Sequence, residues 1–534
     1  MNKKKYDVII IGGGIVGVGI ARDLSMRGLE VALLERYDLA TGATGRSHAL
    51  LHSGGRYVVK DPVSARECAQ ENLVLRKIAS HIIDNVGGLF IGLDVDPPDY
   101  AEKFIKGCKE TGVKCDELSV KEAIKMEPNL NKNVQRAFLV NDAHIDPFKL
   151  TLLNAIDALD AGAKIMTYHE AIVFITNKKD VMGVRVKDNL KNKLKEFYAD
   201  IIVVAAGAWN RKILSMVNIN IEILPNRGTI LVISGRIFNR VINRLRMPSD
   251  GDIIVPSYET NLLGTTSVNV SDPDDNSPSI AEIRTLFLEG KKLFSDMSNL
   301  RILRAYAGPR PLIGRRGGRE APRTFQVFDH EETLRGLISV AGGKLTTYRL
   351  MAEKVSDVVS KKLGIRAPCR THKEPLPGYY DKRDLERLIR KWNFTKLPIA
   401  KILMRWGALA STFLSVSTWK NKLVCYCELV TYPEIKFAIQ RTFARTIGDI
   451  MRRTRATMGP CQGQNCTYKI SSTLYDTIEN YHYYFIRDLK SHLRRRWAGM
   501  RYILNSHQAN QAALQLALFN NLGNFNKILV DNDE

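Results

Sequence analysis

The chain has 534 residues, of which 45% are hydrophobic and 25% charged, a balance that is typical of folded soluble domains and excludes a disordered chain. At about 100–200 residues per domain, this length predicts two to four folding units. Lys and Arg exceed Asp and Glu by 23, which favours anionic partners such as phosphorylated substrates or acidic lipid surfaces, whereas no arginine and aromatic module points to nucleic acid.

The N-terminal segment MNKKKYDVIII has no signal cleavage site, and we predict a first β-strand there. No uninterrupted run of about 18 apolar residues occurs, so we expect no transmembrane segment, and any membrane contact would be peripheral. Eight cysteines without a secretory signal favour a reducing cytosol, where thiols serve metals or chemistry more often than disulfides.

A glycine cluster follows this first strand. Gly12, Gly14 and Gly17 have the spacing G-x-G-x-x-G, and a helical segment and a second strand ending at Glu35 come next. Gly12 permits a tight turn, Gly14 lets the backbone approach a pyrophosphate, and Gly17 lets the helix pack on the strand. Glu35 would then accept hydrogen bonds from the adenosine ribose. The pattern predicts a dinucleotide site, and because no second such fingerprint follows, FAD alone is the simplest interpretation.

Two further segments fit the same site. ADIIVVAAGAWN, residues 199–210, reads as a returning apolar strand whose small residues Ala206 and Gly207 let the backbone run close to a nucleotide. We therefore predict an α/β fold in which a doubly wound, Rossmann-like sheet is split by an inserted substrate domain. In TGATGRSH, the hydroxyls of Thr41, Thr44 and Ser47 can donate to the FAD pyrophosphate or cap a helix start.

Several segments resemble one family, the FAD-dependent glycerol-3-phosphate dehydrogenases, and within it most closely the A subunit of the anaerobic enzyme. They are ERYDLATGATGRSHALLHSGGRY at 35–57, NDAHIDPFKL at 141–150, LLGTTSV at 262–268, RAYAGPRPLIG at 304–314 and VAGGKLTTYRLMAE at 340–353. The resemblance implies oxidation of sn-glycerol 3-phosphate to dihydroxyacetone phosphate, with hydride transfer from C2 to N5 of FAD.

The resemblance also implies the substrate contacts. It assigns substrate binding to Arg56 in HSGGRY, and the two prolines that flank Arg310 limit backbone freedom and so preorganise a second cation. In GGKLTTYR it places flavin and substrate contacts at Gly343, Lys344, Thr346 and Thr347. Two arginines and a lysine suit a phosphate dianion better than a single carboxylate.

The general base stays open between His52, which follows the flavin motif, and a water activated by the cations. Two departures from the family matter. Ile230 stands where the homodimeric relatives carry a histidine, which favours the anaerobic subtype. The segment 314–326 is unusually rich in arginine, so we assign no role to Arg323.

A cysteine set lies near the C-terminus. Cys425 and Cys427 form C-x-C, and Cys461 and Cys466 form C-x4-C after a gap of 33 residues. This spacing predicts a metal or cluster site. The set resembles the bacterioferritin-associated ferredoxin-like module, which implies a 2Fe-2S cluster; structural zinc, which prefers C-x2-4-C on both halves, is the alternative. Thr457 stands where that family usually has glycine, so a tight turn there is expected to be compromised.

We predict four regions: an FAD-dependent oxidoreductase with its substrate subdomain at 1–365, a linker and helical segment at 366–418, a 2Fe-2S-binding module at 419–470 and a basic helical tail at 471–534. In the tail, apolar residues recur every four positions from Phe485 to Trp497. Such a helix docks on an acidic membrane or a partner subunit, or packs on its own domain.

By resemblance, partner subunits, one of them membrane-associated, carry the electrons to a quinone at the cytoplasmic face of the inner membrane. Two other classes of function remain open. One is a flavin enzyme of the same fold that oxidises an amino or 2-hydroxy acid. The other is a non-catalytic FAD and iron-sulfur subunit that only transfers electrons.

Overall fold

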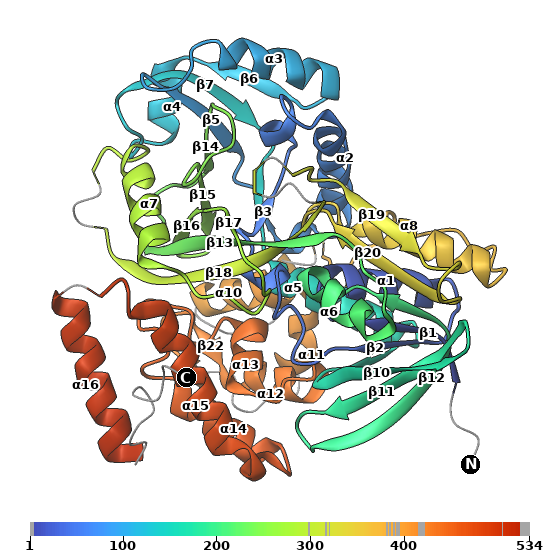
Figure 1. Ribbon diagram of the computed structural model, residues 1–534. Helices are drawn as coiled ribbons and strands as arrows, with labels where there is room; N and C mark the ends of the chain where they lie inside the picture. Colours follow the sequence, from blue (N-terminus) through green and yellow to red (C-terminus); the bar gives the residue numbers. More distant parts are fainter. Residues whose placement is uncertain are drawn as a thin grey trace.

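The structure, a computed structural model, describes residues 5–523 except 297–299, 315–317, 320, 381–382, 384–385, 388–389, 391–395, 415–421 and 505. Parts of the predicted linker and the last eleven residues of the predicted tail lie outside this range. Two large sheets stand one above the other, and a C-terminal group of helices lies beneath the upper sheet and beside the lower one (Figure 1). Within the described residues, no helix combines the length and apolarity needed to cross a bilayer.

The eight-stranded sheet carries the glycine cluster. Its parallel centre runs β9, β2, β1, β12 and β20, and antiparallel β10, β11 and β19 complete it. The bounds are β1 Lys5–Ile11, β2 Val31–Leu34, β9 Lys164–Met166, β10 His169–Asn177, β11 Asp180–Asp188, β12 Lys193–Val204, β19 Phe325–Asp329 and β20 Leu337–Gly342. Residues 8–11 of β1 are all buried, as expected for a parallel strand that is covered on both faces.

Three helices cover one face of this sheet: α1 (Ile15–Met26), α5 (Pro147–Asp160) and α8 (Tyr348–Lys362). Helix α1 lies between the other two. Gly19 permits this close packing, because a Cβ there would lie 3.1 Å from the Tyr348 ring. The helix that follows the glycine cluster is thus fixed by the core of its own domain.

The nine-stranded sheet comes from segments between β2 and β9 and between β12 and β20, which confirms the predicted mixed-sheet insertion. The bounds are β5 Gly88–Leu93, β6 Cys115–Leu118, β7 Val134–Val140, β13 Ile223–Ser234, β14 Val241–Arg244, β15 Ile253–Ser257, β16 Thr260–Gly264, β17 Val268–Asn269 and β18 Ile302–Ile313. Helices α2 (Pro62–Ile78), α3 (Tyr100–Thr111), α4 (Val120–Met126) and α7 (Ile280–Lys291) flank it. The long antiparallel pair β13 and β18 reaches down toward the first sheet (Figure 1).

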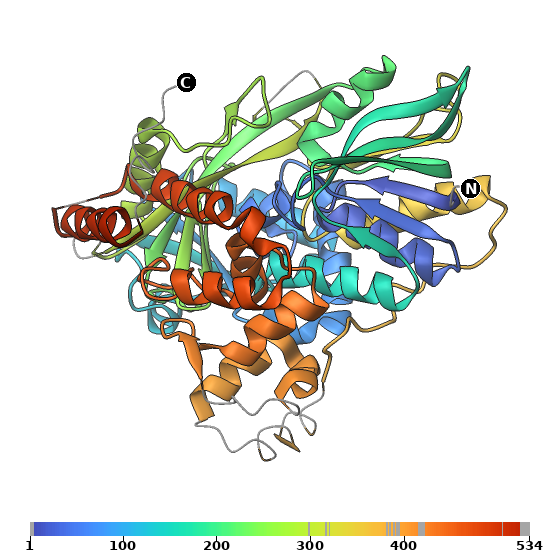
Figure 2. The same ribbon diagram turned by 90° about the horizontal axis from the view of Figure 1, so that it is seen from below.

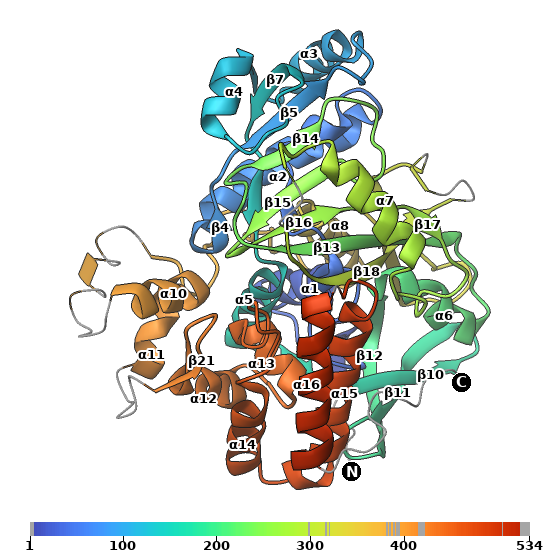
Figure 3. The ribbon, with the colours of Figure 1, turned by 90° about the vertical axis from the view of Figure 1, so that its left-hand side faces the viewer.

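The C-terminal region is helical and contains one small two-stranded sheet. Its elements are α10 Lys396–Trp406, α11 Ala410–Leu414, β21 Leu423–Cys425, β22 Val430–Thr431, α12 Tyr432–Arg441, α13 Ile447–Thr454, α14 Thr467–Thr477, α15 Phe485–Met500 and α16 Ser506–Gly523. One hydrophobic core joins Val424 to Leu493, so the cysteine region and α15 pack as one unit. Viewed from below, this unit lies against the first domain, and α16 lies beside α15 (Figures 2 and 3).

Candidate active site and cluster site

The glycine cluster forms a tight cradle at the end of β1. Gly12 has a φ of 118°, and its amide donates to the Leu34 carbonyl at 2.8 Å. A side chain on Gly12 would strike the Ala205 carbonyl, and one on Gly17 would overlap the carbonyl of Gly12 itself. Gly14 is the open position, since only the Thr44 hydroxyl comes near its Cβ direction. This cradle fits a dinucleotide pyrophosphate at the N-terminus of α1.

Glu35 follows β2, next to this cradle. Its carboxylate accepts hydrogen bonds from the Gly13 amide at 2.7 Å and the Tyr37 amide at 2.9 Å. Burial raises the pKa of Glu35, and these two amide bonds oppose the shift. The carboxylate is therefore held in place at the end of the strand, where the ribose of a bound dinucleotide is expected.

The three hydroxyl residues of TGATGRSH make local contacts. Thr44 accepts from the Ile15 amide at 3.1 Å and so caps α1, Thr41 donates to the Asp38 carbonyl at 3.0 Å, and Ser47 accepts from the Ala49 amide. Capping is one of the two roles that the sequence leaves open for this segment. Contact with FAD stays a prediction for all three.

Two glycine turns face each other at the ends of β12 and β20. The buried Asn210 side chain joins them: its amide group donates to the Val340 carbonyl and its oxygen accepts from the Ala206 amide, both at 2.7 Å. Gly207 has a φ of 57° and Gly343 a φ of 75°, backbone conformations that favour glycine. The structure thus brings the predicted cofactor residues of both turns to one edge of the sheet.

Arg310 projects from β18 into the same region. It donates to the Asn226 side chain at 2.7 Å, to the Thr265 hydroxyl and to the Thr266 carbonyl at 3.1 Å. None of these partners carries a negative charge. Burial, together with repulsion from Arg323 and Arg319, lowers the pKa of Arg310 to about 9. The guanidinium is fixed by neutral groups and forms no ion pair within the described residues, and the nearby Asp250 pairs with Arg319.

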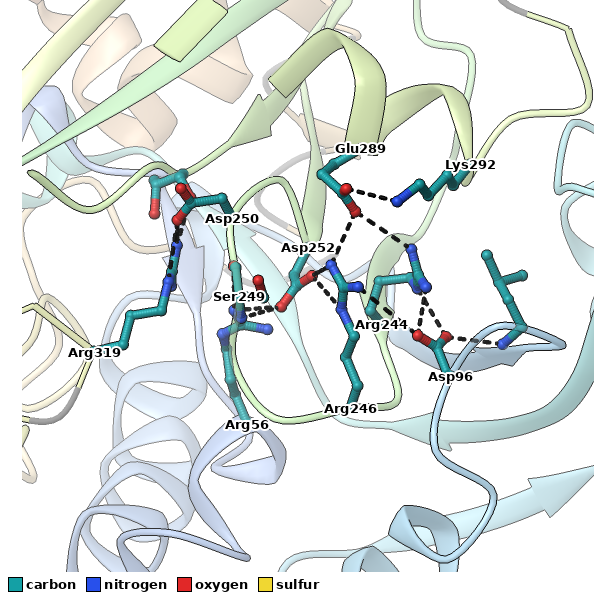
Figure 4. A network of polar contacts seen from close by, with 12 residues as sticks. Arg56, Asp96, Arg244, Arg246, Ser249, Asp250, Asp252, Glu289, Lys292 and Arg319 are labelled. Carbon is teal, nitrogen blue, oxygen red and sulfur yellow. Dashed lines mark hydrogen bonds and ion pairs between the residues drawn. The ribbon is translucent and has the colours of Figure 1, made fainter. Parts of the chain in front are cut away.

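Arg56 is held differently. It forms an ion pair with Asp252 at 3.2 Å, and Asp252 also binds Arg246 and the Ser249 amide in a network of alternating charges (Figure 4). One terminal nitrogen of Arg56 is buried and has no partner. The network therefore positions the side chain and leaves one donor available for a ligand.

Lys344 follows the glycine turn at Gly343. Its ammonium group donates to the Arg323 carbonyl at 2.7 Å and lies 4.7 Å from the centre of the Tyr57 ring. Burial lowers the pKa of Lys344; Cys68, Asp61 and Glu67 oppose this shift, and the positive charge of Arg323 adds to it. The neighbouring hydroxyls hold the local chain: Thr346 accepts from the His52 amide at 3.0 Å, and Thr347 accepts from the Lys344 amide at 3.3 Å.

Two histidines lie among these cations. Burial and the charges of Lys344 and Arg56 lower the pKa of His52 to about 3. Burial and the charges of Arg310 and Arg56 lower the pKa of His48 well below its ordinary value. The Nε2 atom of His48 is buried without a hydrogen-bond partner. Both rings are neutral at physiological pH and have a nitrogen lone pair that can accept a proton.

Sequence reasoning missed three residues of this region: His48, Arg319 and Arg323. Arg323 lies near Tyr57 and Arg310, and Arg319 donates to the Thr265 carbonyl at 2.8 Å while it pairs with Asp250 (Figure 4). The signal for the two arginines was the unusual arginine density of residues 314–326. No comparable signal marks His48.

The four predicted cysteine ligands come together as two pairs. The thiol of Cys466 donates to Cys425, and the thiols of Cys427 and Cys461 are hydrogen-bonded to each other. The bond from Cys466 and the amides of Glu428 and Thr457 lower the pKa of Cys425 to about 6. A thiolate of this kind is the form that binds metal.

A two-iron cluster takes two protein ligands on each iron, whereas structural zinc takes four ligands around one centre. The two cysteine pairs also interact with each other, since Cys425 acts on Cys427 and Cys461 acts on Cys466. Four thiols gathered in this way fit either group.

Thr457 occupies the turn that the sequence singled out. Its φ is 73°, in the left-handed region where glycine is usual, and its amide donates to the Cys425 and Cys466 sulfurs. The turn is formed in spite of the threonine, so the substitution strains the turn without abolishing it.

The cysteine region is joined to the first domain by a buried ionic network. Asp38, just after β2, binds Arg452 at 2.7 Å and Arg453 at 2.5 Å, and Arg452 also binds Asp449. The Tyr168 hydroxyl donates to Asp449 at 2.8 Å. Helix α13 carries both arginines and leads directly into the turn that contains Thr457 and Cys461. The network therefore fixes the cluster site against the domain of the eight-stranded sheet.

The doubly wound sheet, the glycine cradle and the four paired thiols together define a flavin-dependent oxidoreductase with an iron-sulfur module. Two family models agree: FAD dependent oxidoreductase matches residues 7–349, and BFD-like [2Fe-2S] binding domain matches residues 423–475. FAD and a 2Fe-2S cluster are thus the cofactors of this chain.

Sequence relatives show to which family of flavin-dependent oxidoreductases the chain belongs. The chain is 41% identical over 507 residues to the A subunit of the anaerobic glycerol-3-phosphate dehydrogenase of Escherichia coli strain K12, an alignment that covers 93% of each chain. It is 39% identical to the A1 subunit of the same enzyme in Haloferax volcanii, over 96% of this chain and 90% of that one. The chain belongs to the family of the anaerobic glycerol-3-phosphate dehydrogenase A subunits.

A solved structure shares the fold. Glycerol-3-phosphate dehydrogenase from Bacillus halodurans, complexed with FAD, matches with a TM-score of 0.70 at 22% identity and covers 97% of this chain and 95% of its own. The match confirms the predicted architecture of an FAD-binding sheet, an inserted mixed sheet and a helical C-terminal region.

Proposed function

We propose that this enzyme oxidises sn-glycerol 3-phosphate to dihydroxyacetone phosphate and passes the electrons through the 2Fe-2S cluster to partner subunits and a quinone. The observation that carries the substrate assignment is a group of three cations that form no ion pair with the nearby carboxylates Asp61, Glu67 and Asp250. Arg310, Arg323 and Lys344 lie close together, and no ion pair joins any of them to a carboxylate within the described residues. A phosphate dianion would neutralise this charge.

In the proposed complex, Arg310 and Lys344 hold the phosphate, and the spare donor of Arg56 orients the glycerol moiety. Bound FAD supplies the two-electron chemistry by accepting a hydride equivalent from C2 of the substrate. The fixed neutral partners of Arg310 keep its guanidinium in one place before substrate arrives.

The hydroxyl proton of the substrate goes to a neutral imidazole, and we assign this role to His48. The orphaned Nε2 of His48 lies near both substrate-binding arginines, whereas the backbone of His52 is fixed by Thr346. In the free enzyme, burial and, to a smaller extent, the surrounding cations keep the pKa of His48 low. A bound dianion offsets these cations, so the imidazole becomes a stronger base when substrate is present.

The alternative classes fit less well. An amino acid or 2-hydroxy acid needs one arginine to clamp a carboxylate, and uncompensated cations would remain in excess. A non-catalytic electron-transfer subunit would have no need for cations beside the predicted flavin position.

The decisive experiment is anaerobic dye reduction by the purified holoenzyme. We expect bleaching with sn-glycerol 3-phosphate and none with glycerol, lactate or amino acids. The Arg310→Gln variant should lose about 100-fold in kcat/KM, since charge-assisted hydrogen bonds contribute about 1.5–3 kcal/mol each. Equal rates with glycerol and with its phosphate would overturn the assignment.

The electron route has its own test. Substrate added anaerobically should bleach the flavin absorbance and generate the EPR signal of a reduced 2Fe-2S cluster in the same sample. We expect a quinone analogue to be reduced only after partner subunits and membranes that contain them are added. Direct quinone reduction by the isolated chain would contradict the proposed route, which places the enzyme at the cytoplasmic face of the inner membrane.

A further inference from the structure

Several buried side-chain nitrogens without hydrogen-bond partners gather where α15 meets β18. They belong to Arg46, Arg304, His492 and Arg496. We call Arg46, Arg304 and Arg496 the junction arginines. Unpaired buried donors are rare in native proteins, and like charges in one place add to the cost. The group therefore calls for a compensating negative charge.

The contacts between these elements are close. Helix α15 packs on β18, and Figures 1 and 3 place it beneath that strand. A Cβ on Gly499 would lie 3.0 Å from the Ala305 carbonyl and 3.3 Å from Nε of Arg304. A glycine is thus needed for the helix to approach the strand. Arg304 is enclosed between the two elements.

One face of β18 connects this junction to the flavin pocket. Alternate residues of a strand share a face. On this face Arg304 lies at the α15 end, the Tyr306 hydroxyl donates to the Ser47 carbonyl at 3.0 Å, Gly308 contacts Arg46, and Arg310 enters the substrate pocket. Arg46 and Arg304 therefore lie between the predicted flavin position and α15, which carries Arg496.

The other side of the junction touches the cluster site. Arg496 donates to the Cys461 carbonyl at 3.0 Å. Its guanidinium therefore lies directly beside a predicted cluster ligand, where the charge of a bound cluster would offset the charge of the arginines.

The carboxylate of Asp274 lies near Arg46 but already pairs with Arg36 and Lys212. Among the described residues, the junction arginines have no ion pair. Arg495, which neighbours Arg496 on α15, lies near the carboxylates of Asp449 and Asp488. Both carboxylates already have other partners. Asp449 binds Arg452 and Tyr168, and Asp488 accepts from the Tyr481 hydroxyl and the Ile447 amide. His492 is 5% exposed, and burial and the neighbouring arginines keep its pKa at about 3, so its ring is neutral.

We infer that the junction arginines make the 2Fe-2S cluster an electron acceptor for the flavin by offsetting the negative charge that the cluster gains on reduction. Net charge and hydrogen bonding around a cluster set its reduction potential. A buried positive charge favours the reduced, more negative state. The direction of electron flow rests on the proposed function, but the effect on the potential does not.

The test is an EPR-monitored potentiometric titration of the purified holoenzyme with dithionite and mediators, without substrate. We expect Arg496→Gln and Arg304→Gln each to lower the ratio of reduced to oxidised cluster about tenfold at a fixed potential, a shift of about 59 mV for one electron. Arg494→Gln is the matched control, because Arg494 lies exposed on the same helix and loses the same charge. Its midpoint should stay near that of the parent protein.

Iron and sulfide content is measured for every variant. Should Arg496→Gln fail to retain its cluster, Arg304→Gln decides, since within the described residues no hydrogen bond joins Arg304 to the cysteine turns. Arg496→Lys, which keeps the positive charge, should shift the midpoint potential much less than Arg496→Gln does. The inference is overturned if Arg304→Gln leaves the midpoint unchanged or shifts it no more than Arg494→Gln does. Because no substrate is used, a failure here is distinct from a failure of the substrate assignment.

Discussion

At the scale of single residues, the pocket combines fixed cations with imidazoles that stay uncharged. His48 and His52 are neutral because burial and the neighbouring cations disfavour a further positive charge. The cations that we propose as the phosphate site therefore also keep a proton acceptor free. The two functions are linked through electrostatics and need no direct contact between the groups.

This arrangement predicts unequal effects of the two histidines. His48→Asn should lower kcat by about 100-fold to 10,000-fold with little change in KM, because general-base catalysis contributes that much. His52→Asn should lower kcat by less than about tenfold, since its role is not proton transfer. Steady-state dye reduction with sn-glycerol 3-phosphate measures both. A larger loss of kcat in His52→Asn than in His48→Asn would show that His52 is the general base.

The sequence could identify the cations that lie in recognisable motifs, but it could not identify the rest of the pocket. Arg310 is flanked by prolines, and Lys344 follows a glycine pair, so local chemistry pointed to both. Arg319 and Arg323 lie in an arginine-rich segment without a predicted element, and arginines in such segments are usually solvated. Nothing local to His48 distinguished it from His52.

At the scale of elements, the glycine cluster shows how much a short pattern determines. The first strand predicted in MNKKKYDVIII corresponds to β1 (Lys5–Ile11), and the second strand ends one residue before Glu35. Backbone contact requires glycine at Gly12 and Gly17, whereas Gly14 faces open space beside Thr44. The fold itself therefore requires glycine at positions 12 and 17. At position 14 we expect the bound cofactor to impose that requirement.

Two alanine variants should reveal this difference. Gly17→Ala places a methyl group on the Gly12 carbonyl, so the chain should melt earlier and purify without FAD. Gly14→Ala meets only the Thr44 hydroxyl, at 3.3 Å, so it should fold normally but bind FAD weakly. Circular dichroism melting and flavin absorbance after gel filtration measure the two effects. A Gly14→Ala variant with full FAD content would contradict the assignment of this position.

Helix α15 illustrates a choice that sequence alone left open. Its apolar stripe packs into its own unit, since Leu489 and Leu493 are buried in the core of the cysteine region. The same helix buries His492 beside Arg495 and Arg496. A periodic pattern shows that a helix has an apolar face, but not which surface covers that face.

Burial of His492 predicts a pH-dependent stability. The unfolded state takes up a proton near pH 6.5, whereas the folded state does so only near pH 3. Stability is therefore full above pH 6.5 and is lost as the pH falls toward 3. Between about pH 7 and pH 5, the parent protein should lose about 2 kcal/mol more than His492→Gln.

Urea denaturation at both pH values measures this difference. His482→Gln is the control, because His482 is exposed and should behave like the parent protein. Other buried histidines contribute equally to all three proteins, so the comparison isolates His492. The same pH dependence in His492→Gln and the parent would show that this residue is not the source.

At the scale of the whole molecule, two cofactor sites are held together by buried charge. Asp38 joins the dinucleotide domain to Arg452 and Arg453 of α13, and the junction arginines lie between the same two regions. These contacts bridge segments that are hundreds of residues apart in the chain. Local sequence patterns identified both sites but contain no information about how the sites face each other.

Loss of the Asp38 carboxylate should separate the two regions. Asp38→Asn leaves the buried Arg453 without an ion pair among the described residues and Arg452 with Asp449 alone, and removing one partner of a buried pair costs about 3–5 kcal/mol. We expect the cysteine region to unfold at a lower urea concentration. After substrate is added, the EPR signal of the reduced cluster should appear more slowly, whereas the flavin should be bleached at nearly the rate of the parent protein. Asp99→Asn removes an exposed carboxylate that pairs with Lys103 and is the control. Equal midpoints for the two variants would show that the network does not join the regions.

The turn that carries Asp38 begins at Glu35, so one short stretch of chain joins the position predicted for the adenosine ribose to the contact that holds the iron-sulfur region. Where binding of FAD orders this stretch, thermodynamic reciprocity requires that docking of the iron-sulfur region strengthens FAD binding by the same factor. We therefore expect a chain that loses one prosthetic group to retain the other less well.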